Sequence, residues 1–409
     1  MTADFRPLSG TKTAPEAGAP SIEAGGYGPV WLLAVGQTVG YCGLYYIYAA
    51  LLPDWEATLG WSKATLAVGP TLAILLSALL APVIGRLVDG GHGGTVLVAG
   101  PLIGAAALLA LAFVTTPLQF ALGWAVIGLA QAMSFYEACF SYLTRVFGAG
   151  ARPAITRVTL VAGFASTITF PAAAMLVHLT DWRGAVIGFA LALALVAAPA
   201  NLLGSRCLRD QGAGRLRESG MGLKPAMVRR EFWLLALIFG LLYLDHGILL
   251  TYVLPIFADR GVGTGLAVAA AACIGPAQVG ARLLLLVNER VSTGWTARAS
   301  IVSMGLAAVV LLAAGVAPVL VFGFALLQGG AMGVVSILRP VLTAEVLGRV
   351  SFGAVSGAMA MAPLLAGAAA PFLGAGLIAA VGVPGLIWAT IAMMGLALAA
   401  ALALRRSEG

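Results

Sequence analysis

Apolar residues in this chain rarely alternate with polar ones; they run together for roughly twenty residues at a time, as membrane-spanning helices require. Because an α-helix rises about 1.5 Å per residue, such a run spans the roughly 30 Å hydrocarbon core of a bilayer. Twelve runs meet this description and predict an all-α membrane protein, with helices at 29–52, 64–88, 95–114, 118–146, 154–178, 183–204, 232–256, 264–287, 299–316, 318–341, 352–379 and 383–404.

Composition supports this interpretation. The 409 residues are 61% hydrophobic and 10% charged, with a mean hydropathy of +1.00. A soluble domain has about 25% charged residues, so this chain cannot cover a water-facing surface and its surroundings must be a lipid bilayer. The net charge of +7 is accounted for by membrane topology, and we expect no nucleic-acid partner.

The polar segments determine the orientation. We predict a disordered N-terminal tail at 1–28, a basic linker at 205–230 and a short tail at 405–409. The linker carries seven Lys or Arg against two acidic residues, and such residues stay on the cytoplasmic side. With the tails inside, the outer loops hold only Lys63, Arg183 and Arg260. The pattern therefore predicts that both termini are cytoplasmic.

The two halves of the chain repeat each other. Leu52-Pro53 matches Leu254-Pro255 at an offset of 202 residues, and Pro171 matches Pro371 at an offset of 200. The matches predict two pseudo-symmetric six-helix bundles, at 29–204 and 231–404. Two such halves around a midplane site are the plan of alternating-access transporters.

Five ionisable residues lie inside predicted spans: Glu137, Asp245, His246, Arg282 and Arg339. Each costs at least about 2.5–3.5 kcal/mol at the centre of a membrane helix, so such groups face a cavity or a partner. Arg282 has two interpretations. Its side chain could extend to the interface or pair with Glu289, or its guanidinium could bind an anion in a cavity.

The other four residues also leave alternatives open. Glu137 and Arg339 hold equivalent places in the two repeats and bear opposite charges. They could form a bridge between the halves or pair locally, Glu137 with Arg145 or Arg157 and Arg339 with Glu345, and Arg339 could also attract an anion. Asp245 and His246 could carry a proton that moves with substrate, or could form a helix–helix contact.

Tyrosines crowd the first predicted helix. Tyr41, Tyr45, Tyr46 and Tyr48 could line a cavity and assist anion binding, or belong to helix packing or an interfacial aromatic belt.

The layout resembles the major facilitator superfamily. The stretch GRLVDGGHGG at 85–94 looks like the loop that follows the second helix in that superfamily, with Gly85, Leu87 and Asp89 in place and glycines where basic residues usually follow. This resemblance implies that Gly85 and Asp89 belong to a loop involved in the conformational change.

Further stretches resemble the monocarboxylate-transporter branch and its bacterial relatives, namely GWS at 60–62, YEACF at 136–140, RPAITRVTLVAG at 152–163, GFASTITFP at 163–171 and DWRGA at 181–185. The resemblance implies that Arg282 holds a substrate carboxylate, with Gln278 four residues before it. Tyr46 stands where some animal members carry a binding lysine, and Gln278 stands where some members carry an acid. It also implies a bacterial inner membrane.

These observations predict a secondary active transporter that moves a small organic anion, a monocarboxylate, together with a proton, as a monomer. The chain contains no P-loop, metal-ligand cluster or nucleophile triad, so we expect neither an enzyme nor a cofactor. Proton-driven efflux of a drug-like compound is the alternative. A passive channel or a sensor is a third possibility, which the repeated halves and the opposite charges disfavour.

Overall fold

The computed structural model describes residues 27–212, 222–287, 291–349 and 351–405. The tail expected at 1–28 therefore lies almost entirely outside the described residues. The N-terminal half is built from helical segments: α1 Gly28–Tyr41, η1 Cys42–Tyr46, α2 Ile47–Leu59, α3 Lys63–Leu87, η2 Val88–His92, α4 Gly93–Leu111, α5 Pro117–Ser134, α6 Tyr136–Phe147, η3 Gly148–Gly150, α7 Ala151–Ala162, α8 Ala165–Leu179, α9 Trp182–Ala192, η4 Leu193–Ala197 and α10 Ala198–Gly212.

The C-terminal half contains fewer and longer segments. They are α11 Leu223–Val228, α12 Arg230–Thr251, α13 Val253–Asp259, α14 Thr264–Val287, α15 Thr293–Ala313, α16 Leu320–Leu347 and α17 Phe352–Arg405. All of these elements are helical, which confirms the predicted fold class.

Ten continuous helical stretches among the described residues are long and apolar enough to cross a membrane. Two of them, with 48 and 53 residues, are about twice the length of a span. Each contains a glycine with a left-handed backbone, Gly91 (φ 89°) and Gly382 (φ 69°), where the chain turns back. Ala370 and Leu386 accordingly lie in one apolar cluster, on either side of the second turn. Each long stretch therefore makes two crossings, which brings the number of crossings to the predicted twelve.

Several helix boundaries differ from the predicted ones. The first span continues to Leu59 through the π-helical turn η1, and the span expected at 232–256 breaks at Tyr252. The helix expected to begin at 299 begins at Thr293, and α10 runs into the linker as far as Gly212. Hydropathy detects only the apolar part of a helix, because polar residues at its ends leave the hydrophobic run without leaving the helix.

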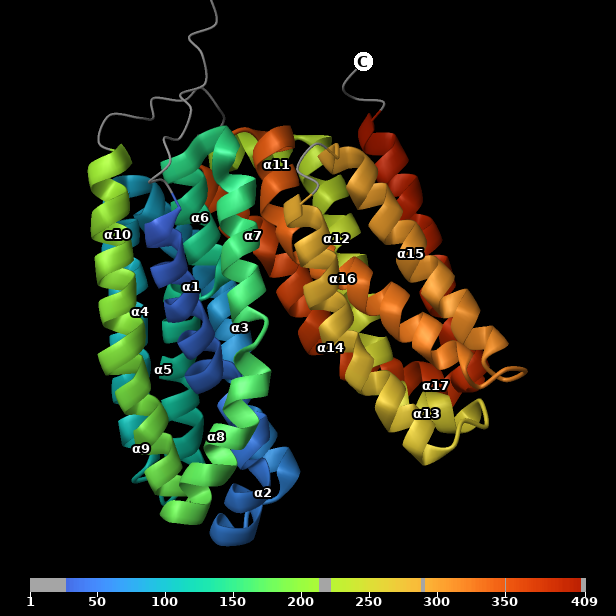
Figure 1. Ribbon diagram of the computed structural model, residues 1–409, viewed down its shortest axis with the longest axis horizontal. Helices are drawn as coiled ribbons and strands as arrows, with labels where there is room; N and C mark the ends of the chain where they lie inside the picture. The colour runs from blue at the N-terminus through green and yellow to red at the C-terminus, as the bar shows by residue number, and fades with distance from the viewer. Residues whose placement is uncertain (1–26, 213–221, 288–290, 350, 406–409) are drawn as a thin grey trace, which may run out of the picture.

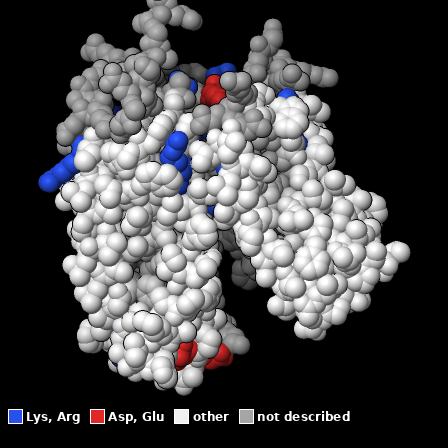
Figure 2. All heavy atoms as spheres, viewed as in Figure 1, with Lys and Arg blue, Asp and Glu red and all other residues white. Residues whose placement is uncertain are grey.

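The two halves form a V (Figure 1). They meet at the end where the described chain starts and stops, which we call the termini end, and they separate toward the opposite, open end, where α2 and α13 lie. Figure 2 shows the cleft between them and flanks that are largely free of charged side chains. Large apolar side chains are exposed on the surface, for example Phe113 (75%) and Phe372 (77%), as contact with lipid requires.

The interiors of the two halves are separate. Two apolar clusters lie mainly in the N-terminal half, one around Trp55 and Trp124 and one around Phe140. Two more lie in the C-terminal half, around Phe239 and Phe257. The cluster around Phe140 also includes Leu285, Ile337 and Val341 from the C-terminal half. It therefore joins the halves at the termini end.

The surface where α3, α6 and α7 meet α14, α16 and α17 is the seam. Glycines allow the backbones of α3 and α17 to touch there: a Cβ on Gly85 would overlap the carbonyl of Gly353, and one on Gly357 would overlap the carbonyl of Ala81. Small residues are the usual means by which membrane helices pack closely.

Candidate functional site

Polar and charged side chains from both halves gather along the seam. We call this group the central polar cluster and define it by Glu137, Tyr136, Tyr46, Arg282, Arg339 and Tyr243. The N-terminal half supplies the first three and the C-terminal half the last three. Such groups are concentrated here because α6, α14 and α16, which carry most of them, are the helices that face the other half.

Glu137 and Arg339 form an ion pair across the seam, with 2.6 Å between Oε1 and Nη2. Their side chains are 18% and 5% exposed, respectively. Of the two arrangements that the sequence leaves open, the structure contains the bridge between the halves. Arg145 donates instead to the carbonyl of Asp89, and Glu345 accepts a hydrogen bond from Thr293.

Arg282 also reaches across the seam. Its Nη1 donates to the carbonyl of Thr159 in the other half (2.9 Å), while Nε donates to the carbonyl of Gly333 (3.2 Å). Nη2 lies 3.5 Å from Oε1 of Gln278, one turn earlier on α14. These bonds occupy three of the five guanidinium N–H groups, which leaves two for another acceptor.

The side chain of Arg282 does not extend to the membrane surface, because the residue is only 6% exposed. Glu289, the other partner considered, lies outside the described residues. Space for the guanidinium comes from Gly163, at the break between α7 and α8, since a Cβ there would lie 2.8 Å from Nη1. The glycine therefore permits the contact between Arg282 and the N-terminal half.

Tyrosine side chains surround the two arginines. The phenols of Tyr46 and Tyr136 lie near Arg282, and that of Tyr243 lies beside Arg339. Tyr45 packs edge-on against Tyr46 and is 46% exposed. Tyr45 thus packs against a member of the central polar cluster.

Other tyrosines of the first span are placed differently. Tyr41 stacks on Phe135 with the ring centroids 4.2 Å apart and also contacts Tyr136. Tyr48 packs against Trp55 and Trp124 in the core of the N-terminal half. Tyr48 is therefore a packing residue.

Asp245 and His246 occupy different environments from Glu137. Asp245 follows the buried stripe of Ile238 and Leu242 on α12, is fully buried, and accepts a hydrogen bond from Gln328 Nε2 at 2.9 Å. Its Oδ1 has no partner among the described residues, and the same is true of Nδ1 of His246. Asp245 thus joins α12 to α16 inside one half and does not bridge the seam.

The loop predicted to contain Gly85 and Asp89 is helical, because Gly85 lies inside α3 and Asp89 lies in the π-helical turn η2. Asp89 joins the two halves at the termini end. Its carboxylate accepts hydrogen bonds from the backbone N–H groups of Gly353 (2.7 Å) and Ala354 (2.9 Å), at the N-terminus of α17. A carboxylate is favourable there because helix N-terminal N–H groups are unpaired and carry partial positive charge. Gly85, one turn earlier, is in backbone contact with Gly353.

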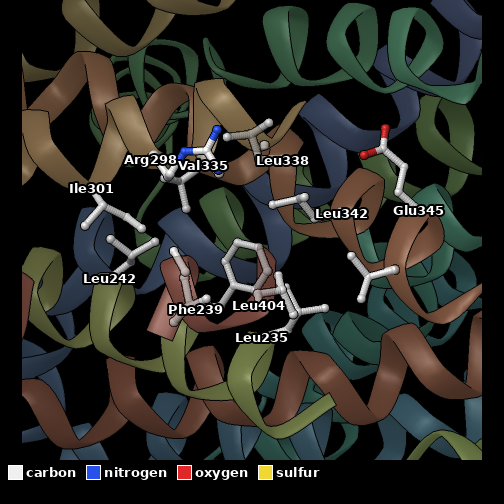
Figure 3. Close-up of a pocket in the computed structure, with 15 residues that line it drawn as sticks. Leu235, Phe239, Leu242, Arg298, Ile301, Val335, Leu338, Leu342, Glu345 and Leu404 are labelled. Carbon is white, nitrogen blue, oxygen red and sulfur yellow. The ribbon is translucent and has the colours of Figure 1, made fainter. Parts of the chain in front are cut away.

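A separate cavity of about 160 Å³ lies within the C-terminal half (Figure 3). Its walls, from α12, α15, α16 and α17, are largely apolar and include Phe239 and Leu242, with Arg298 and Glu345 as its charged members. It does not include the central polar cluster. No group of three or more possible metal ligands occurs within the described part of the chain.

Sequence reasoning did not identify Tyr136, Tyr243, Thr159 or Gly163 as site residues. Tyr136 and Gly163 lie in stretches that carry the family resemblance, YEACF and GFASTITFP, so a signal was present. No signal in the sequence indicated Tyr243, which is a tyrosine in an apolar helix, or the carbonyl of Thr159, which is a backbone group.

Comparison with known proteins supports the interpretation of the fold. The sequence model described as Major Facilitator Superfamily matches residues 33–287, more than half of the chain. The chain belongs to the major facilitator superfamily. No curated protein sequence matches it.

Two solved structures of this superfamily's fold illustrate the likeness. One is described as FucP, a Major Facilitator Superfamily transporter in the outward conformation; it has a TM-score of 0.71 and 12% identity, over 92% of this chain and 98% of that one. The other is a bacterial homologue of the iron transporter ferroportin in an outward-facing state, with a TM-score of 0.65 and 14% identity, over 92% and 99%. Both likenesses are at the level of the fold.

Membership of the major facilitator superfamily makes this chain a multi-pass membrane protein of a family of transporters of small molecules, not of enzymes.

Proposed function

We propose that this transporter moves a small organic anion, in particular a monocarboxylate, with a proton, by alternating access. The observation that carries the proposal is Arg282, a permanently charged group that is 6% exposed, lies at the seam and has no acidic partner among the described residues. Its bonded partners are neutral oxygen atoms, so its charge remains uncompensated. A carboxylate is the natural ligand for a guanidinium fork with two free N–H groups.

We further propose that the structure represents the outward-open state of the transporter. The first and last described residues and the described flanks of the basic linker lie at the termini end, which we assign to the cytoplasm by the distribution of Lys and Arg. With this orientation the cleft opens outward. The two similar structures are likewise described as an outward conformation and an outward-facing state of their own proteins. The setting in a bacterial inner membrane and a monomeric state belong to the same proposal.

Glu137 is the proton carrier that we propose. It lies at the seam and is paired with Arg339 of the other half, so a proton on Glu137 would remove the charge that holds the two halves together here. Asp245 is the weaker choice, because its bond to Gln328 is internal to one half and does not change when the halves rock.

Uptake into liposomes tests the carboxylate site. Purified protein is offered labelled small monocarboxylates with and without a pH gradient, as native chain, Arg282→Ala and Arg282→Lys. We expect Arg282→Ala to abolish uptake and Arg282→Lys to reduce it at least about tenfold, because an ammonium cannot reproduce a planar fork. Uptake that survives in Arg282→Ala would sink the anion site. Export of dyes without any carboxylate uptake would favour the efflux alternative.

A further inference from the structure

A second cavity lies at the termini end and is made by both halves. It measures about 290 Å³ and is lined from the N-terminal half by Thr144, Gly150 and Arg152, and from the C-terminal half by Ala344, Glu345 and Arg349. On α7, Arg152 is seven residues from Thr159, whose carbonyl binds Arg282, which is about 10 Å along the helix axis. This closed-end cavity is therefore distinct from the central polar cluster.

The two arginines of the closed-end cavity have unused donors. Arg152 Nη1 donates to the carbonyl of Val291 at 2.9 Å, but its Nη2 is buried without a partner among the described residues. Nε of Arg349 is likewise buried and unpartnered in the described part of the chain. A buried donor without an acceptor destabilises the structure, and more so when it is charged. An acceptor bound in this cavity could form hydrogen bonds with both of these donors and so stabilise both.

The backbone adds to the positive potential. The twelve-residue helix α7 begins at Ala151, which also lines the cavity, and no side chain caps its N-terminus at Gly150. The positive end of the helix dipole therefore lies at the cavity, where the N–H of Ala151 already bonds to the carbonyl of Gly148 and Pro153 has no N–H. Glu345 opposes this, but its Oε1 already accepts a hydrogen bond from Thr293 at 2.9 Å. With two arginines and one carboxylate, the cavity keeps a net charge of about +1.

We propose that the closed-end cavity binds a phosphate group, either inorganic phosphate or the headgroup of an anionic phospholipid. Two guanidinium groups, one from each half, line one space at the positive end of a helix dipole, and guanidinium groups recognise phosphate oxygens by paired hydrogen bonds. Because each half supplies one arginine, the complete site exists only while the termini end is closed. Bound phosphate therefore stabilises the closed state and restrains the transport cycle.

The test measures thermal unfolding of the full-length protein in nanodiscs of neutral phosphatidylcholine, with inorganic phosphate or chloride at equal ionic strength. A second arm replaces part of the lipid with phosphatidylglycerol and omits phosphate. We expect one of the two sources to raise Tm of the native chain, and Arg152→Ala and Arg349→Ala to lose that rise. Arg183→Ala should keep it, because Arg183 lies over the ring of Trp182 and does not line the cavity.

A second variant keeps the test valid if the alanine variants fold poorly. Glu345→Gln removes the only carboxylate among the described residues that line the cavity, and its amide oxygen can still accept the bond from Thr293. Phosphate or phosphatidylglycerol should therefore bind this variant several-fold more tightly than the native chain. Spin labels at Thr58 and Ala258, at the open end, should report a longer mean distance and a narrower spread of distances when the site is filled. A Tm rise of equal size in all variants, or none in the native chain from either source, would overturn the proposal.

Discussion

At the scale of single residues, the site depends on glycines as much as on charges. Arg282 donates to the carbonyl of Thr159 only because Gly163 has no side chain. The guanidinium is held by fixed backbone carbonyls, so its position is set before any substrate arrives. A preorganised charge of this kind binds an anion without the cost of ordering the side chain.

We therefore expect Gly163→Ala to weaken carboxylate binding without removing any charge. The new Cβ would lie 2.8 Å from Nη1 of Arg282, so the guanidinium must move. Overpacking costs about 1–3 kcal/mol, and a loss of 1.4 kcal/mol corresponds to about tenfold in affinity. The matched control is Gly280→Ala, two residues from Arg282, where a Cβ would meet nothing within 4 Å. Equal binding of a labelled monocarboxylate by both variants would contradict the expectation.

The acidic residues lead to a second prediction at the scale of single residues. Glu137→Gln should abolish the stimulation of uptake by a pH gradient, because it cannot take up and release a proton at the seam. Exchange of labelled for unlabelled monocarboxylate without a gradient should persist. Asp245→Asn is the control, since its hydrogen bond is to Gln328 within the C-terminal half. Gradient-driven uptake that requires Asp245 and not Glu137 would reverse our assignment.

At the scale of helices, closure of the termini end depends on how near α3 comes to α17. Gly85, Gly353 and Gly357 let the two backbones touch, and Asp89 then accepts hydrogen bonds from the N–H groups of Gly353 and Ala354 in the first turn of α17. The approach and the capping bonds support each other, because the carboxylate reaches the helix N-terminus only when the helices are in contact.

Gly357→Ala should accordingly shift the equilibrium toward a state that is open at the termini end. A Cβ at this position overlaps the carbonyl of Ala81, which is backbone and cannot rotate away. The expected cost to the closed state is about 1–3 kcal/mol. Gly376→Ala, in the same helix but with nothing within 4 Å of its Cβ, is the control. Distances between spin labels at the open end should shorten in the first variant and stay unchanged in the second.

At the scale of the whole molecule, the described contacts between the halves are polar bonds, one shared apolar cluster and the close backbone packing of α3 on α17. The Glu137–Arg339 pair and the Arg282–Thr159 bond lie along the seam, and Asp89 lies at the termini end. Contacts of this kind can break and form again, as the proposed alternating-access cycle requires.

A double-mutant cycle on Glu137→Gln and Arg339→Gln measures that contribution. Removing one partner of a buried ion pair costs about 3–5 kcal/mol. Because the Glu137 side chain is 18% exposed, we expect each single variant to destabilise the state closed at the termini end by about 3 kcal/mol, the lower end of that range. The double variant leaves no unpaired charge, so its shift should be smaller than the sum of the two. The readout is the population of each state in spin-label distance distributions, and additive shifts would contradict a direct coupling.

The sequence by itself determined that the chain spans a bilayer about twelve times in two repeated halves, because runs of apolar residues follow directly from the thickness of the membrane. It also identified Glu137, Arg282 and Arg339, because a charge in such a run stands out. It did not determine whether Glu137 pairs across the seam or locally, since either partner was compatible with helix geometry. It could not find the carbonyl of Thr159 or the closed-end cavity either, because backbone atoms and interfaces between distant segments leave no pattern along a chain. Only the packing of one half against the other decided those features.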